Sequence, residues 1–482
     1  MKRKFLTNLI LLVFLNLLIK PFWIFGIDRT VQNMVGDESY GLYFALFNFS
    51  MILNILLDVG ITNYNNCNIA KHNFLLPKHL ANIVGLKFIL AFVYAIFSLT
   101  AAFIIGYNKI QFHLLFFLIL NQFMISLTLY LRSNISALHL FRTDSLLSVL
   151  DRSVMIIICS LLLFTDIING NFNIRWFVYA QTIAYFITVL ITFTIVLHKS
   201  GRIKLQIHKK FILVFLRKSY PYALLILLMS LYNRIDSVML ERMLPEPTGK
   251  EQAGIYAQAF RLLDAVAMFG ALVGGLLLPI FARMIKQNDP VNQMVKLSFS
   301  LLIVPAIIIS VASVLYNSEI MTLLYKSNTG QSSELLGILM IGFIGIASTY
   351  IFGTLLTANG SMKQLNIMAS CAVLLNIALN LILIPEYQAY GSAYASMATQ
   401  LLAGASQLFI AMYIFKLKPG IKYIVKIITF VVMVIITGIL SKNTGNWLGG
   451  LVIFGAVSLL TAFILKLINV KNLFEIVLSK QN

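Results

Sequence analysis

Charged side chains interrupt several of the longest apolar runs in this sequence. An ionisable group in an apolar medium is costly and normally faces a cavity or a partner, so each such residue is a candidate for function. The charged residues singled out here, within these runs or at their edges, are Lys20, Asp28, Asp58, Arg234, Asp236, Arg261 and Asp264. The planar guanidinium of arginine binds phosphate oxygens through two parallel hydrogen bonds, and lysine adds a point charge. Lys20, Arg234 and Arg261 are therefore each a candidate contact for an anionic group.

The carboxylates allow a second interpretation, in which the charges are structural. Arg261 and Asp264 are spaced i, i+3, which is the usual geometry of an ion pair on one helical face. Asp236 is likewise close enough in sequence to neutralise Arg234. Asp58, near the end of its run, is interpreted as a structural or gating contact. Asp151 and Arg152 are interpreted as interfacial residues at the start of a helix.

The elements that carry these residues are long apolar segments. Apolar residues make up 59% of the 482 positions and charged residues only 11%, whereas a soluble domain has roughly a quarter charged residues. Runs of about twenty apolar residues can cross a hydrocarbon core of about 30 Å as helices. The sequence therefore predicts an all-α integral membrane protein with about fourteen transmembrane helices. These segments span residues 6–27, 40–62, 80–106, 112–131, 146–165, 176–197, 220–240, 254–280, 295–316, 335–358, 365–385, 390–415, 421–440 and 447–468.

Basic residues fall mainly in alternate connections between these segments. The chain has a net charge of +20, and seven lysines and arginines lie in the loop 199–218 alone. With an even number of segments, the positive-inside rule places both termini in the cytoplasm. The positive charge is therefore assigned to topology, and no nucleic-acid partner is expected. The loop 199–218 is expected to lie at the membrane surface and to contact anionic lipids.

Two parts of the sequence share one spacing. Gly36, Gly41 and Tyr43 follow the pattern Gly-x4-Gly-x-Tyr, and Gly249, Gly254 and Tyr256 follow it again. The first copy lies at the second predicted segment and the second at the eighth, which predicts two six-helix halves related by a pseudo-two-fold axis along the membrane normal. The expected parts are an N-terminal bundle (1–198), a basic linker (199–218), a second bundle (219–416) and two further helices (417–482).

Several motifs resemble one known family. They are Gly41-Leu-Tyr43, Asp58-Val-Gly60, Ala358-Asn-Gly360-Ser-Met-Lys363, and a stretch from Asn376 through Asn380, Pro385 and Gly391 to Thr399. With these residues the chain resembles the polysaccharide or O-antigen flippases (Wzx-type) of the multidrug/oligosaccharidyl-lipid/polysaccharide exporter superfamily. The resemblance implies a MATE-like fold in which helices one, two, seven and eight line a central cleft. Lys20, Arg234 and Arg261 are then expected to face one chamber.

The same resemblance implies a substrate and a location. The substrate would be an undecaprenyl-pyrophosphate-linked oligosaccharide, moved from the inner to the outer leaflet of the bacterial cytoplasmic membrane for O-antigen, capsule or exopolysaccharide assembly. A polysaccharide polymerase and a chain-length regulator are conceivable partners. The sequence leaves open the glycan, the oligomeric state, the preferred conformation, and whether a proton or sodium ion is coupled.

Two alternative classes remain. A multidrug exporter of the same superfamily would use buried carboxylates, for which Asp28 and Asp236 are available, but Lys20 and Arg234 nearby oppose a bound cation. An enzyme of glycan assembly is disfavoured, because the predicted outer loops are short and no DxD, HExxH, CxxC or GxxxxGK motif occurs. No cofactor or metal is expected.

Overall fold

A computed structural model of the chain describes residues 14–62, 65, 69, 76–138, 140–165, 172–200, 209–418 and 420–468. These residues are almost entirely helical, and no strand occurs among them. Eleven of the described helices are long and apolar enough to cross a membrane, judged by length and composition. The basic triplet 2–4, residues 201–208 of the basic loop, and Lys471 and Lys480 lie outside the described residues.

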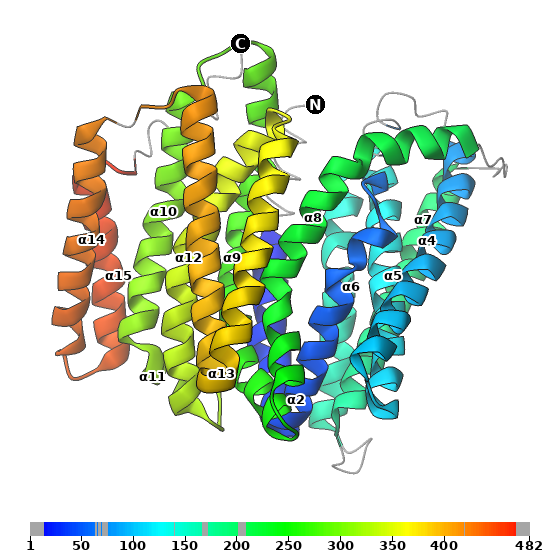
Figure 1. Ribbon diagram of the computed structural model, residues 1–482, viewed down its shortest axis with the longest axis horizontal. Coiled ribbons are helices and arrows are strands. Elements are labelled where there is room, and N and C mark those ends of the chain that lie inside the picture. The colour runs from blue at the N-terminus through cyan, green and yellow to red at the C-terminus, as the bar shows by residue number, and fades with distance from the viewer. Residues whose placement is uncertain are drawn as a thin grey trace. The chain divides into compact units, whose positions relative to one another are not determined.

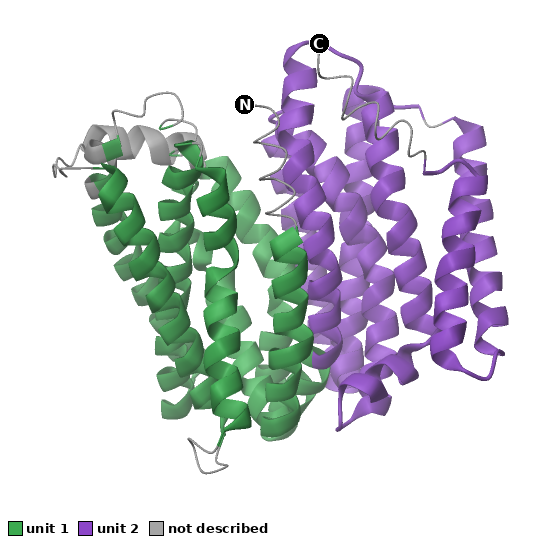
Figure 2. Ribbon diagram, turned by 180° about the vertical axis from the view of Figure 1, so that it is seen from behind, with its two compact units in different colours: residues 1–257 green, residues 258–482 purple. Residues whose placement is uncertain are grey.

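The helices group into two compact units, residues 1–257 and residues 258–482 (Figure 2). The elements of the first unit are η1 (Trp23–Asp28), α2 (Arg29–Ile52), η2 (Asn54–Leu57), α4 (Leu76–Ile105), α5 (Lys109–Ala137), α6 (Phe141–Phe164), α7 (Ile174–Ser200), α8 (Lys209–Met243) and the first turns of α9 (Thr248–Lys286). The second unit holds the rest of α9, then α10 (Asn292–Leu315), α11 (Asn317–Leu324), α12 (Thr329–Ala358), α13 (Met362–Phe415), α14 (Ile421–Lys442) and α15 (Trp447–Ile464) (Figure 1). This grouping does not test the predicted six-helix halves or the linker 199–218, which stay predictions.

The first helix is longer than its apolar run predicts. It continues through a π-helical stretch, Trp23–Asp28, and bends only at Gly36, whose φ of 79° is open to glycine at little cost. The prediction that this helix ends at Ile27 is therefore wrong. Asp28, just beyond the end of the apolar run, therefore lies inside the helix. The residue is only 2% exposed, and its carboxylate accepts a hydrogen bond from a tyrosine hydroxyl of the same unit.

The two copies of the glycine motif meet in the first unit. A Cβ on Gly41 would lie 1.9 Å from the carbonyl oxygen of Lys250, and one on Gly254 would lie 2.0 Å from that of Asp37. Each glycine therefore lies against the backbone of the residue that stands four positions before the other glycine in the sequence. The two backbones approach so closely that no side chain fits between them, so the crossing requires glycine at both positions. The repeated spacing found in the sequence thus has a packing cause.

A second close crossing organises the second unit. α13 is two helices merged across a bend at Gln388 (φ 51°), which agrees with the two predicted segments 365–385 and 390–415. Ser392 donates a hydrogen bond to Asn380 Oδ1 at 2.7 Å across this bend. The later arm of α13 packs on α12 where Gly404 meets Gly345, and a Cβ on Gly404 would lie 2.5 Å from the carbonyl oxygen of Gly345.

Candidate functional site

Two cations, Lys20 and Arg152, lie on helices of the first unit. Lys20 is half-buried on the first helix and is within electrostatic range of Arg152, Asp151 and Arg132. Arg152 lies in the middle of α6, with its Cζ 5.5 Å from the ring centroid of Trp23 and 5.9 Å from that of Tyr185. Two aromatic faces therefore hold the guanidinium in place. Its Nε is 3.6 Å from Asp151 Oδ2, which is too long for a strong hydrogen bond.

The position of Arg152 corrects a prediction. The sequence was interpreted with Asp151 and Arg152 at the start of a helix, but α6 begins ten residues earlier, at Phe141. The polar residues Arg142, Thr143 and Asp144 hid this start, because they fall outside the apolar run. Asp144 is satisfied by Arg132, whose Nε donates to its Oδ1 at 2.8 Å. The apolar residues Leu146 and Leu147 before Asp151 were the available signal that the pair lies within the helix.

The aspartates of the first and seventh predicted segments are each bonded to a tyrosine. Tyr40 donates a hydrogen bond to Asp28 Oδ2 at 2.8 Å. Tyr256 donates one to Asp236 Oδ2 at 3.0 Å, and this aspartate is 1% exposed. The two tyrosines are not equivalent in the repeat, since Tyr43, the counterpart of Tyr256, accepts a hydrogen bond from Gln181 at 2.8 Å. The predicted structural equivalence of Tyr43 and Tyr256 stays a prediction.

Arg234 lies on α8, two residues before Asp236. Its Nη1 donates to Asn48 Oδ1 at 3.4 Å, and the amide nitrogen of Asn48 donates to Ser237 Oγ at 2.8 Å. An amide is a weaker partner for a guanidinium than a carboxylate. The side chain is half-buried.

Arg261 belongs to the second unit and has the partner that its spacing predicts. Its Nη1 is 3.9 Å from Asp264 Oδ2, and the two side chains are 13% and 20% exposed. At this distance the two charges attract each other without a direct hydrogen bond. The expectation that Arg261 shares one chamber with Lys20 and Arg234 stays a prediction.

A buried lysine that the sequence analysis overlooked holds Asp58. Lys87, at the middle of α4, is fully buried, and its Nζ donates to Asp58 Oδ1 at 2.6 Å, to the carbonyl oxygen of Leu57 at 2.9 Å and to Ser126 Oγ at 2.8 Å. These three acceptors match the three donors of an ammonium group. Asp58 follows η2, where the helix is broken, so this lysine satisfies the backbone that the break releases.

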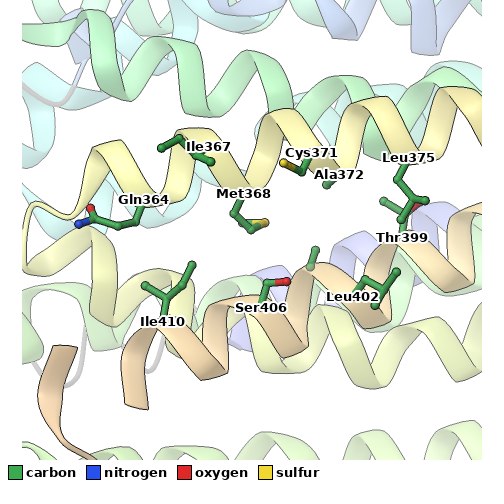
Figure 3. A pocket seen from close by; sticks show the side chains of 11 residues that line it. Gln364, Ile367, Met368, Cys371, Ala372, Leu375, Thr399, Leu402, Ser406 and Ile410 are labelled. Atoms are coloured by element: carbon green, nitrogen blue, oxygen red, sulfur yellow. The ribbon is translucent and has the colours of Figure 1, made fainter. Parts of the chain in front are cut away.

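The second unit contains an apolar pocket of about 560 Å³ between the two arms of α13 (Figure 3). Ile367, Met368 and Cys371 on the first arm face Leu402, Ser406 and Ile410 on the second across an open space. No charged side chain lines this pocket. It is therefore not suited to hold an anion, which leaves the charged residues described above as the candidate site.

Comparisons with solved structures define the class of protein. The lipid II flippase MurJ, in an inward closed conformation, superposes with a TM-score of 0.73 at 16% identity and covers 94% of this chain and 98% of its own. The eukaryotic MATE transporter AtDTX14 gives 0.63 at 15% identity over 84% of this chain and 95% of its own. A transporter of the MOP superfamily from Pyrococcus furiosus, described as having a binding pocket of reverse polarity, superposes with a TM-score of 0.58 at 14% identity. This match covers 85% of this chain and 94% of the other. The chain is thus a multi-pass, all-α membrane protein with the fold of MOP-superfamily transporters.

The family model for polysaccharide biosynthesis proteins matches residues 6–285, more than half of the 482 residues. The chain belongs to this family. No curated protein matches it. The family resemblance found in the sequence is confirmed at this level.

Proposed function

We propose that the protein flips an undecaprenyl-pyrophosphate-linked oligosaccharide from the inner to the outer leaflet of the bacterial cytoplasmic membrane by alternating access. The product would serve O-antigen, capsule or exopolysaccharide assembly. Its partners would be the lipid-linked oligosaccharide and membrane lipids, with a polymerase and a chain-length regulator acting on the outer side. It acts as a transporter in this proposal and carries out no covalent chemistry.

The observation that carries the proposal is the guanidinium of Arg152, which lies inside the first unit with its Cζ 5.5 Å from the ring centroid of Trp23 and 5.9 Å from that of Tyr185. These two rings hold the guanidinium in a fixed orientation. Lys20 is within electrostatic range of the same residue and adds a second positive charge. A pyrophosphate has the charge and the acceptor oxygens to bind such cations. Arg234 and Arg261 are further cations for the same anion in this proposal.

The structure fits a cation exporter less well. Asp28 and Asp236 are the carboxylates such a protein would use, but each is almost fully buried and accepts a hydrogen bond from a tyrosine. The membrane potential also favours outward movement of an anion, by about 2.3 kcal/mol per charge for each 100 mV, inside negative.

Reconstitution tests the function directly. The purified chain in liposomes is expected to move a fluorescent undecaprenyl-pyrophosphate oligosaccharide to the leaflet where a membrane-impermeant glycosidase can cleave it. Empty liposomes and liposomes with heat-denatured protein give the background rate. A translocation rate equal to that background, together with active transport of an organic cation, would replace the proposal by the exporter alternative.

The orientation of the chain gives a second prediction. Both termini are expected to be cytoplasmic and the loop 245–249 extracytoplasmic, because the basic residues partition in that way. A single cysteine at Thr248, in a variant without the native cysteines, should react with an impermeant maleimide added to intact spheroplasts. A cysteine at Lys363 should react only after the membrane is permeabilised. The opposite labelling pattern would invert the topology.

A further inference from the structure

A cavity of about 520 Å³ opens in the second unit where the start of α10, the end of α13 and the start of α14 meet. Its lining has two zones. Lys296, Lys418 and the amide side chain of Gln293 lie toward the helix ends, and apolar side chains such as Phe299 and Ile427 lie one or two turns deeper along the helices. A polar mouth over an apolar interior is the layout of a bilayer near its surface.

The charges at the mouth are all positive. Lys296 is exposed, and its Nζ lies 4.7 Å from the ring centroid of Tyr423. The hydroxyl of Tyr423 shares a hydrogen bond of 2.7 Å with Ser300 Oγ, which fixes the ring below the ammonium group. Lys418 is also exposed, no carboxylate lines the cavity, and neither lysine forms an ion pair with a described residue.

We propose that this cavity binds an anionic phospholipid of the surrounding leaflet. The lipid phosphate lies between Lys296 and Lys418, and one acyl chain enters the apolar part lined by Phe299 and Ile427. Lysine suits this role because its long apolar stem can follow the cavity wall while its ammonium group reaches the phosphate. The inference is independent of the substrate that the protein transports.

The lining selects this class of ligand over its nearest rivals. Inorganic phosphate would neutralise the lysines but leave the apolar part of the cavity unfilled. A zwitterionic phospholipid would fill it but bring a third cation to a mouth that already holds two lysines. An anionic head group has neither disadvantage. Lys363, Lys416 and Lys422 lie near the same end of the unit, which is the end predicted to be cytoplasmic.

A bound lipid would also support the packing of α14. This helix packs against α10 and α15 in the second unit, with Val434 and Phe430 buried against Ile303 and Ile307 of α10. Toward its start, α14 exposes Ile424 and Ile428, and both line the cavity. The acyl chain would cover these side chains and bridge the two helices.

Photocrosslinking tests the proposal at the level of residues. The full chain is reconstituted in phosphatidylethanolamine vesicles with a trace of phosphatidylglycerol carrying a photoreactive acyl chain, and labelled peptides are identified by mass spectrometry. Label is expected on peptides of α10 and α14 that line the cavity. Lys296→Gln and Lys418→Gln should each lower the apparent affinity about fivefold, as expected for about one phosphate contact per lysine. The double variant should lower it by roughly the product.

Matched control variants test whether the labelling is specific to the cavity. Lys363→Gln, at the same end of the unit but outside the cavity, should leave the labelling unchanged. Ile427→Trp should reduce it by filling the apolar part, and inorganic phosphate should fail to compete. Unchanged labelling in the double lysine variant, equal labelling by a photoreactive phosphatidylcholine, or displacement by inorganic phosphate alone would each overturn the proposal.

Discussion

Replacing Arg234 or Arg261 by alanine is expected to abolish glycan export while the protein stays folded and inserted in the membrane. If each arginine contributes a charge-assisted hydrogen bond to pyrophosphate, its loss costs about 1.5–3 kcal/mol, which is roughly a tenfold to hundredfold loss of transport. The measurement is surface glycan in a strain that lacks the native gene, with membrane abundance determined for each variant. Arg175→Ala, an exposed arginine at the start of α7, is the matched control and should export normally.

The alternative interpretation of Arg261 predicts a different pattern. If Arg261 only neutralises Asp264, at 3.9 Å, then Arg261→Ala should lower abundance, and Arg261→Ala/Asp264→Ala should restore both abundance and export. If Arg261 binds the anion, the double variant should remain inactive. Arg261→Lys should then export only in part, because it keeps the charge but loses the planar fork. Normal export by both Arg234→Ala and Arg261→Ala would eliminate the anion site as proposed.

The apolar runs were sufficient to predict the helices because a membrane span has a length set by the bilayer and few charges. Most predicted segments fall on a helix as far as they are described, including the two segments that meet at Gln388 in α13, whereas the segment 40–62 crosses the break that follows α2. The boundaries were predicted less well wherever polar residues continue a helix. One predicted segment ends at residue 27, but the helix continues past Asp28 and Arg29. Another begins at residue 146, but α6 already begins at Phe141.

The candidate site was predicted only in part, because sequence reasoning finds a charge but not its partner. The lysine that pairs with Asp58 lies 29 residues away, on another helix, and nothing in the local pattern connects them. The electrostatic interaction of Lys20 with Arg152 likewise involves residues far apart in the chain. The spacing of Arg261 and Asp264 could be interpreted correctly because one helix contains both residues.

The repeat was detectable for the opposite reason. Its glycines recur at fixed spacing because each must let another backbone approach, and this demand restricts the residue type itself. The side chains around the repeated glycines are freer to differ. Tyr40 bonds Asp28 in one copy, while Tyr256 bonds Asp236 in the other.

The second large effect is expected at Lys87. Replacing it by alanine should destabilise the protein by about 3–5 kcal/mol, because Asp58 and the carbonyl oxygen of Leu57 would lose a buried partner. The expected results are a lower melting temperature in detergent and lower abundance in the membrane. Lys109→Ala, at an exposed lysine at the start of α5, should leave both unchanged.

The pair of Lys87 and Asp58 can be separated into a structural and a gating role. In the variant Lys87→Met/Asp58→Asn the charges are removed together, so no unpaired charge is buried, and most of the lost stability should return. The helix is broken after η2, where Val59 (φ 45°) and Gly60 (φ 83°) have positive φ angles. In this variant Ser126 is expected still to donate its hydrogen bond to the carbonyl oxygen of Leu57, so the break keeps one buried partner. If abundance and export both recover, the ion pair only holds the break. If abundance recovers and export does not, the charges are needed during the conformational cycle. A single Lys87→Ala variant as stable as the native protein would contradict both roles, since a buried lysine with three acceptors cannot then be supporting the backbone it contacts.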